Sequence, residues 1–345
     1  ELSGVWIMAY TDIDNPELYF QTKLYTGTGS SNAITLDGSE NMQPDWVWIK
    51  CRDDSHNHQV FDSVRGVHKR MRTDTNGAET SSTESLKSFD SDGFTLGTQA
   101  NVNASASGDN SFVAWNWKKT ATAGFDIVSY TGNGSNRTIS HSLSAVPKMM
   151  IVKNRDATEE WTIYHAGNTS APATDYLALN TNGATTDSNT RWNDTAPTSS
   201  VFTVGTSGVV NANGQKFIAY LFAEKQGYSK FGSYVGNNNA NGNFIYTGFK
   251  PAFFFVKNAT EAGYAWELFD NKRNATDGVG NIIKNRLFPD TSAVEGTNSD
   301  GYCDFVSNGV KIRKAGDSNS ANTYIYWAIA ENPFVTSGGV ATTAR

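Results

Sequence analysis

The sequence repeats itself three times with a period of about 105 residues. Tyr25, Tyr130 and Tyr234 each begin a Tyr-x-Gly segment, and they lie 105 and 104 residues apart. Self-similarity at a fixed spacing indicates one structural unit present in several copies. A period this long exceeds a solenoid repeat or a propeller blade, so each copy is large enough for a small fold of its own.

Other blocks keep the same order in every copy. About twenty residues after the tyrosine comes a proline followed by an apolar run that ends in lysine, at 44–50, 147–153 and 251–257. Each copy closes on an aromatic segment, at 112–117, 217–222 and 324–329. These blocks divide the chain into an N-terminal arm at 1–19, repeats at 20–119, 120–226 and 227–334, and a C-terminal tail at 335–345. The sequence from Met8 to Asp12 is typical of a natural chain start, so 1–7 is interpreted as an extension, native or foreign.

The blocks have the character of β-strands. Runs such as 46–49 and 253–256 are apolar at every position, as a strand buried on both faces requires. Segments rich in Gly, Asn and Ser separate them, and no amphipathic helix pattern is present. The sequence therefore predicts an all-β protein of three tandem β-sandwich, jelly-roll-like repeats.

Charge and hydropathy exclude two classes of partner. The formal net charge is −6, and no basic stripe is present, which argues against nucleic-acid binding. No run of eighteen apolar residues occurs, so we expect no membrane insertion. The two cysteines, Cys51 and Cys303, are too far apart and too few for a disulfide framework, so they are predicted to be small thiols within the fold.

One segment resembles a metal site at first inspection. Cys51, His56 and His58 lie close in sequence, but zinc sites normally show paired ligands at tight spacing, and no second pair follows. We interpret this segment as a solvated loop and predict no metal and no cofactor, since nucleotide-binding fingerprints are also missing.

The acidic residues do not suggest catalysis. Glu159 and Glu160 are adjacent, and neighbouring strand residues point to opposite faces. The copies also share no acid: Asp62 and Asp270 correspond, but the second copy has His165 there, which suggests a strand-end Asp bonded to a local turn. We predict a protein that is not an enzyme; a depolymerase would need two acids facing one groove.

The second repeat contains the candidate ligand-binding residues Arg191, Trp192, Asn193 and Asp194, within a polar loop that has no close counterpart. Aromatic faces stack on sugar rings, and polar loop residues bond hydroxyls. Trp192 is therefore either an exposed platform or a residue packed beneath its own loop. The long polar loops 184–199 and 274–298 differ most between copies, and binding residues concentrate in such loops.

With these blocks identified, the chain resembles a family of proteins encoded by phages of marine bacteria and cyanobacteria. The resemblance runs from about Met8 to Arg345. It is carried by the segments Phe20–Gly27, Gln43–Lys50, Asp62–Gly66, Ser91–Gly97, Ala114–Lys118 and Phe269–Arg273. Members are often labelled as tail fibres, so the resemblance implies a virion structural or host-recognition protein.

We therefore expect a tail fibre or receptor-binding appendage, assembled into the virion in the host cytoplasm. Its expected partners are other virion proteins and a host surface glycan. A homo-oligomer, a trimer by analogy with phage fibres, is also expected. The alternative is a capsid decoration or other virion-stabilising protein, and a polysaccharide depolymerase is the third interpretation.

Overall fold

The computed structural model describes residues 9–273 and 281–342, so the predicted extension at 1–7 and part of the loop 274–298 lie outside the described residues. The fold is all-β, with 43% of residues in strands that pair antiparallel. Helices are single turns, namely η1 (Pro16–Leu18), α1 (Ala100–Asn103), η2 (Pro172–Thr174), α2 (Asn189–Trp192), α3 (Gly208–Asn211) and η4 (Asp317–Asn319). Within the described ranges no helix is long and apolar enough to cross a bilayer.

Each repeat contains an inner sheet and a smaller outer sheet. Repeat 1 has β1 (Phe20–Thr26), β9 (Ser111–Trp117), β3 (Trp46–Cys51) and β4 (Gln59–Asp62) inside, β2 (Asn32–Thr35), β8 (Gly93–Leu96) and β7 (Leu86–Asp90) outside, and the ribbon β5 (Lys69–Arg70) with β6 (Thr80–Ser81). Repeat 2 has β10 (Phe125–Thr131), β17 (Lys216–Ala223), β12 (Pro147–Asn154), β13 (Thr162–His165), β14 (Asp175–Ala178) and β15 (Thr186–Asp187) inside, and β11 (Arg137–Ser140) with β16 (Val201–Val204) outside. Repeat 3 has β18 (Ser229–Val235), β27 (Thr323–Pro333), β20 (Phe249–Asn258) and β21 (Glu267–Asp270) inside, β19 (Phe244–Tyr246), β26 (Gly309–Ile312), β25 (Cys303–Val306) and β22 (Ile282–Ile283) outside, and the ribbon β23 (Asn285–Arg286) with β24 (Gly296–Thr297).

The predicted all-β fold of repeated sandwich-like units is confirmed. The three proline-led runs become β3, β12 and β20, and each lies between the closing aromatic strand and the next strand of its own inner sheet. Their equivalent positions agree with the internal repeat.

The three inner sheets share one hydrophobic core. Along β3, Trp46 and Trp48 point into this shared core, whereas Val47 and Ile49 point into the sandwich core of repeat 1. Side chains of all three repeats meet there, among them Trp46, Trp117, Phe222, Phe253 and Trp327. The ring centroids of Phe222 and Trp327 are 4.4 Å apart, and those of Trp117 and Trp327 are 5.6 Å apart. Both faces of these strands are therefore apolar because one face packs inside its own sandwich and the other packs against the other two repeats.

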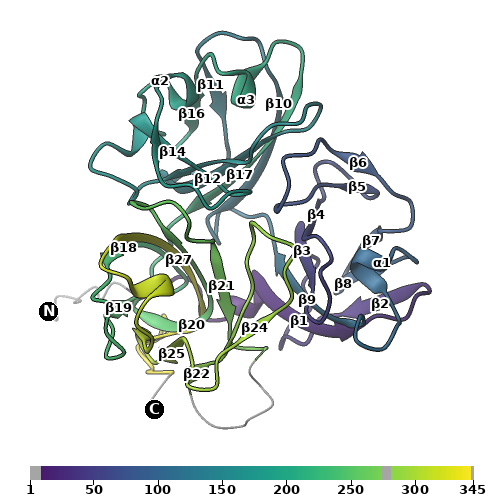
Figure 1. Cartoon of the computed structure of the whole chain (residues 1–345), viewed down its shortest axis with the longest axis vertical. Coiled ribbons are helices and arrows are strands. Elements are labelled where there is room, and N and C mark those ends of the chain that lie inside the picture. Colours follow the sequence, from purple (N-terminus) through teal and green to yellow (C-terminus); the bar gives the residue numbers. More distant parts are fainter. Residues whose placement is uncertain (1–8, 274–280, 343–345) are drawn as a thin grey trace, which may run out of the picture.

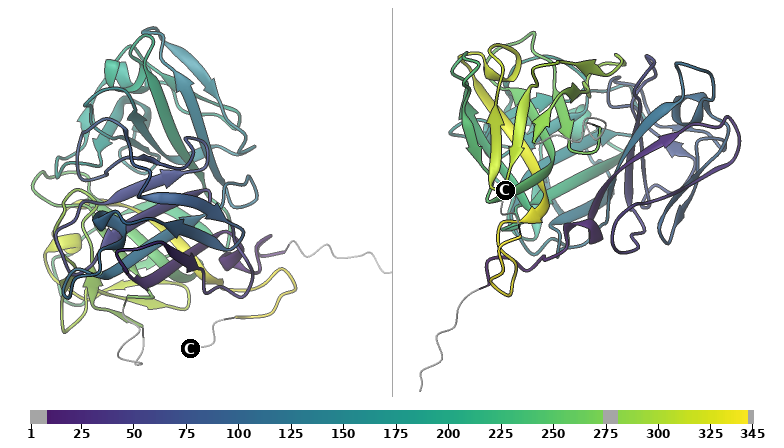
Figure 2. Two further views of the ribbon diagram at one scale, coloured as in Figure 1. Left: turned by 90° about the vertical axis from the view of Figure 1, so that its right-hand side faces the viewer. Right: turned by 90° about the horizontal axis from the view of Figure 1, so that it is seen from below.

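Figure 1 shows the result as three lobes around a common centre, with repeat 1 in purple to blue, repeat 2 in teal, and repeat 3 in green to yellow. Figure 2 shows the three lobes from two further directions, and ring contacts such as Trp46–Tyr220, Trp117–Phe253 and Phe222–Trp327 join each lobe to the other two. The described parts of the N-terminal arm and of the C-terminal tail also touch, because Ser337 donates its backbone N–H to Asp14 at 2.6 Å. The repeats are therefore interlocked and not strung in a line.

Ring N–H groups link the repeats in a cycle. His58, Trp161 and Trp266 occupy equivalent positions, each one residue before the strand that follows the lysine-ended run. His58 Nε2 lies 3.1 Å from a repeat 3 carbonyl, Trp161 Nε1 donates to a repeat 1 carbonyl at 2.8 Å, and Trp266 Nε1 donates to a repeat 2 carbonyl at 3.0 Å. His58 is fully buried, so the interpretation of this segment as a solvated loop is wrong for that residue.

The strand-end acids bond local turns, as predicted, and they also join repeats. Asp62 accepts backbone N–H bonds from the next turn and a hydroxyl bond from Tyr220 of repeat 2 at 2.7 Å. Asp270 has the same turn bonds and accepts from Trp115 Nε1 of repeat 1 at 3.0 Å. His165 lies 3.0 Å from a backbone carbonyl of repeat 3.

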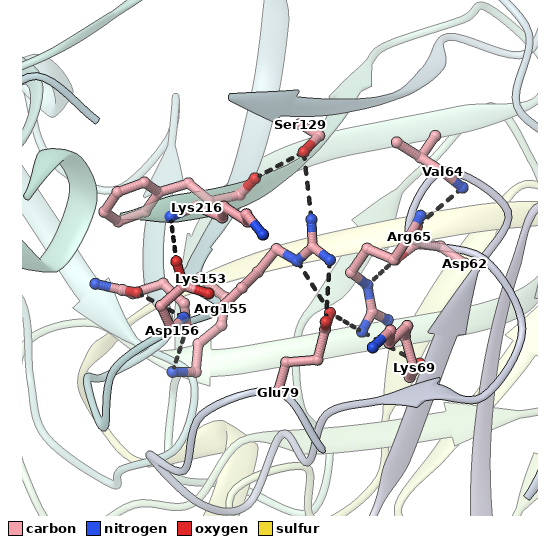
Figure 3. Close-up of polar contacts among 12 residues, drawn as sticks. Asp62, Val64, Arg65, Lys69, Glu79, Ser129, Lys153, Arg155, Asp156 and Lys216 are labelled. Atoms are coloured by element: carbon pink, nitrogen blue, oxygen red, sulfur yellow. Dashed lines mark hydrogen bonds and ion pairs between the residues drawn. The ribbon is translucent and has the colours of Figure 1, made fainter. Parts of the chain in front are cut away.

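Two of the three seams contain an Arg–Glu–Arg bridge. Figure 3 shows Glu79 of repeat 1 between Arg65 of the same repeat and Arg155 of repeat 2, with Arg155 Nε 2.9 Å and Arg65 Nη1 3.2 Å from the carboxylate. Glu295 of repeat 3 bridges Arg273 and Arg52 in the same way.

Among the described residues, the seam between repeats 2 and 3 has no such bridge. There Thr185 donates its backbone N–H to the carbonyl oxygen of Ala259 at 2.9 Å, Lys257 Nζ donates to the carbonyl oxygen of Asn182 at 3.4 Å, and Lys230 pairs with Glu224 at 2.8 Å. The cost of removing two charges from water offsets much of the attraction in a buried ion pair, so such a pair is weak evidence for added stability. We infer that the charged pairs fix the register of two seams.

Candidate functional site

Of the four residues predicted to bind a ligand, Arg191 and Trp192 are buried, Asn193 is half-buried and Asp194 is exposed. Trp192 is fully buried in the core of repeat 2. Its Nε1 donates to the carbonyl of Asp175 at 3.0 Å, and its ring meets Tyr164 edge-on with centroids 6.0 Å apart. Of the two interpretations of this ring, the exposed stacking platform is wrong, and packing beneath its own loop is confirmed. A ring with no exposed face cannot stack on a sugar.

Arg191 is buried as well. Its guanidinium lies over the ring of Tyr176 at 4.4 Å from the centroid, donates to Ser207 Oγ at 2.8 Å, and pairs with Glu160. Asn193 adopts φ of 52° and ends α2, and Asp194 follows on the exposed surface. Of the four predicted residues, Asp194 is thus the most accessible to a ligand.

The equivalent location in repeat 3 also contains an arginine stacked on a tyrosine, but the two residue types have exchanged positions: Tyr302 stands where repeat 2 has Arg191, and Arg286 stands where it has Tyr176. Arg191 accepts a backbone bond from the residue that follows β16, and Tyr302 accepts one from the residue that follows β26. Tyr176 and Arg286 likewise occupy matching ribbon positions, in β14 and β23. Arg286 lies over Tyr302 at 4.4 Å from the ring centroid.

Beside this pair, repeat 3 has a cavity of about 300 Å³. Aromatic and polar side chains from five segments line it, including Asn258, Tyr264, Glu267, Arg286, Asp317 and Tyr324. Strand β21 supplies the glutamate, the ribbon supplies the arginine, and η4 supplies the aspartate. Small-molecule sites combine apolar walls with a few converging polar groups, and this cavity has that composition.

A buried carboxyl group lies in the cavity wall. Glu267 is 5% exposed, and burial raises its pKa to about 7, although Arg286 opposes that rise. Arg286 pairs with Glu267 and also with Asp317, whose Oδ2 lies 3.1 Å from Arg286 Nη1. Lys314 adds a second cation at 2.6 Å from Asp317. Two acids therefore line one cavity, and one arginine contacts both.

Three polar atoms at this cavity have no hydrogen-bond partner among the described residues. They are Asn258 Nδ2, Glu267 Oε2 and Arg286 Nε, all buried. A buried polar atom without a partner costs about 1–3 kcal/mol, and native proteins normally satisfy such atoms with protein groups or water. Two donors and one acceptor are thus available to a polar occupant.

The sequence contains only a weak signal for this site. The lining residues come from positions between 256 and 324, and Glu267 stands where the other copies have Gln59 and Thr162. Glu267 is an acid at a strand position that is neutral in the other two copies. This difference is visible only when strand β21 is aligned with β4 and β13.

The equivalent region of repeat 1 brings together Cys51, His56 and Asp109. Cys51 corresponds to Asn258, since both pair with the first aromatic residue of the closing strand. Asp109 is more than fifty residues from the other two, which is why sequence spacing gave no metal pattern. The same location therefore differs in chemistry among the three copies.

The fold and site define an all-β protein of three interlocked sandwiches with a polar and aromatic cavity in the third. Residues 15–333 match the family described as Domain of unknown function (DUF7483), and the chain belongs to that family. A comparison with curated proteins finds no match.

Proposed function

We propose that this protein is a phage virion component, a tail fibre or receptor-binding appendage, that recognises a host surface glycan through the cavity of repeat 3. The observation that carries the proposal is the set of unpartnered buried polar atoms beside Tyr264 and Tyr324. Sugar hydroxyls both donate and accept hydrogen bonds, so one sugar can satisfy the donors and the acceptor together. The phage setting rests on the sequence resemblance.

The rigid scaffold supports this role. Three repeats with one core hold the cavity in a fixed shape, which reduces the ordering cost of binding. Weak single-site contacts then gain from display of many copies on one particle. A homo-oligomer, a trimer included, remains part of the proposal, and the mass of the protein in solution tests it.

We propose binding without catalysis. Glycosidases need one carboxyl group as acid and one free carboxylate as nucleophile or base. Glu267 and Asp317 line one cavity, but one cation, Arg286, pairs with an oxygen of each, so neither carboxylate is free of a counter-charge. Purified protein should release no reducing ends from host polysaccharide. Release that disappears in Glu267→Gln would show an enzyme instead.

The test of glycan recognition compares two tyrosines. Tyr264 lines the cavity, and Tyr246 lies on β19 outside it with 57% of its surface exposed. Binding of the full chain to oligosaccharides from host outer polysaccharide is measured by calorimetry. Tyr264→Ala should weaken binding at least tenfold, whereas Tyr246→Ala should leave it unchanged. Equal affinity for both variants would contradict the cavity as the site.

The alternative role is a capsid decoration or other virion-stabilising protein. The interlocked core and the bridged seams favour it, because they suit a rigid structural element. Immunogold labelling or a virion reconstruction separates the two: label on the tail supports recognition, and label spread over the capsid supports decoration.

A further inference from the structure

Three side chains of repeat 1 with different metal-binding atoms converge at the end of β3. The sulfur of Cys51, Nε2 of His56 and a carboxylate oxygen of Asp109 all lie within 4.8 Å of one another. Cys51 Sγ is 3.6 Å from Asp109 Oδ1, and His56 Nε2 is 2.7 Å from the same oxygen. A second carboxylate, that of Asp53, places Oδ1 3.2 Å from the sulfur.

We propose that Cys51, His56 and Asp109 form a zinc site in repeat 1, with Asp53 or water as the fourth ligand. Zinc accepts thiolate, imidazole and carboxylate ligands together, in tetrahedral geometry. The site is independent of the proposed glycan cavity, which lies in another repeat.

The distances suit a tetrahedral ion with little movement. Zinc–ligand bonds of about 2.0–2.3 Å place neighbouring ligand atoms roughly 3.3–3.7 Å apart. The sulfur already has two carboxylate oxygens at 3.2 and 3.6 Å. The contact between His56 and Asp109 must lengthen, and Cys51 Sγ and His56 Nε2, which lie within 4.8 Å of each other, must come into the same range. The side chains of His56 and Asp109 are both 22% exposed, so they have room to turn.

The second ring nitrogen of His56 is held as in many zinc sites. His56 Nδ1 lies 3.2 Å from Asn101 Oδ1. Metal-bound histidines usually donate this other N–H to an oxygen, which fixes the tautomer and the ring direction. When Nδ1 donates to Asn101, Nε2 directs its lone pair at the cluster. The oxygen opposite Nε2 is then satisfied either by a second ring proton or by a cation between the two atoms.

With water as the fourth ligand, the charge also balances. A bound zinc ion deprotonates a coordinating thiol outright. The Cys51 thiolate and the Asp109 carboxylate then carry two negative charges against the two positive charges of the ion. Because the ligand is the thiolate, binding of the ion to Cys51 releases the thiol proton.

The other two repeats have different residues at the positions of the proposed ligands. Asn154 and Asn258 occupy the position of Cys51, and Glu159 and Tyr264 occupy the position of His56, two residues before Trp161 and Trp266. Neither copy has a thiol or an imidazole at these positions. The combination of thiol and imidazole is therefore particular to repeat 1, as expected if it serves a purpose beyond the shared fold.

Cobalt substitution in the full chain tests the proposal. Co²⁺ bound to a thiolate gives a sulfur-to-metal charge-transfer band in the near ultraviolet, together with strong visible bands when the geometry is tetrahedral. We expect one Co²⁺ per chain, both sets of bands, and loss of both when Zn²⁺ is added. The protein supplies a matched control, because Cys303 is its only other cysteine and is also buried.

The variants separate the site from a general effect on the fold. Cys51→Ser should abolish the charge-transfer band, and Cys303→Ser should retain it. His56→Gln, a change at a half-buried position, should weaken Co²⁺ binding at least tenfold without altering the unfolding temperature of the metal-free protein. Wild-type protein with no thiolate band overturns the proposal. A band that survives in both Cys51→Ser and His56→Gln overturns it equally.

Discussion

Repeats 2 and 3 place an arginine on a tyrosine at the same position of the same fold, and the Nε atoms of Arg191 and Arg286 both lack a partner among the described residues, but the asparagines beside the two pairs differ. In repeat 2, Asn154 Nδ2 donates to Gln215 at 2.5 Å and to Gly208 at 3.4 Å. In repeat 3, Asn258 Nδ2 has no partner among the described residues and lies in a cavity wall. Two copies of the same fold can thus differ in whether an individual polar atom has a hydrogen-bond partner. A binding site can arise where such an atom has none.

The largest expected effect concerns the core of repeat 2. Trp192→Ala should destabilise the protein by about 3–5 kcal/mol, because it removes a fully buried ring and leaves a cavity. Glycan binding by the variant should stay unchanged below its unfolding transition. Chemical denaturation measures the first quantity and calorimetry the second. A loss below about 1 kcal/mol would place the ring at the surface.

The second prediction uses the carboxyl group that only repeat 3 has at this position. Glu267 has a pKa of about 7 in the folded protein and 4.5 in the free side chain, so the folded protein keeps a proton that the unfolded chain has lost. Stability is therefore lost as pH rises from about 4.5 to about 7. The shift corresponds to at most about 3 kcal/mol.

Glu267→Gln removes this dependence. The difference in unfolding free energy, variant minus wild type, should be more positive at pH 8 than at pH 4.5. Denaturant titrations at both pH values measure it. Thr162→Val, at the equivalent position of repeat 2, is the control and should show no such change. A constant difference for Glu267→Gln would mean that this carboxyl group titrates normally.

The smallest expected effect compares the two asparagines directly. Both accept two backbone N–H bonds in their turns through Oδ1, but only Asn154 also donates through Nδ2. Asn154→Ala should cost about 1 kcal/mol more than Asn258→Ala, the typical value of a net hydrogen bond. Equal costs in denaturation would indicate that Asn258 has a partner in solution.

The candidate site is only partly predictable from the sequence. The polar, individual loop of repeat 2 predicts ligand contacts at Arg191 and Trp192, but Trp192 occupies a core position of that repeat. A polar loop does not reveal that one of its residues turns inward, because that depends on the space left by the opposite sheet. The sequence does not distinguish Glu267 as a site residue, because its neighbours in sequence are apolar strand residues.

The sequence by itself determined the three copies, their strands and the burial of both strand faces, because these follow from a repeat period and from local side-chain patterns. Only the tertiary structure decided what covers the second face. An apolar strand face requires a partner but does not specify one, and here the partners are the other two repeats. The same holds for the bridge at Glu79, the cavity at Glu267 and the cluster at Cys51, since each joins residues far apart in the chain whose proximity depends on how the sheets pack.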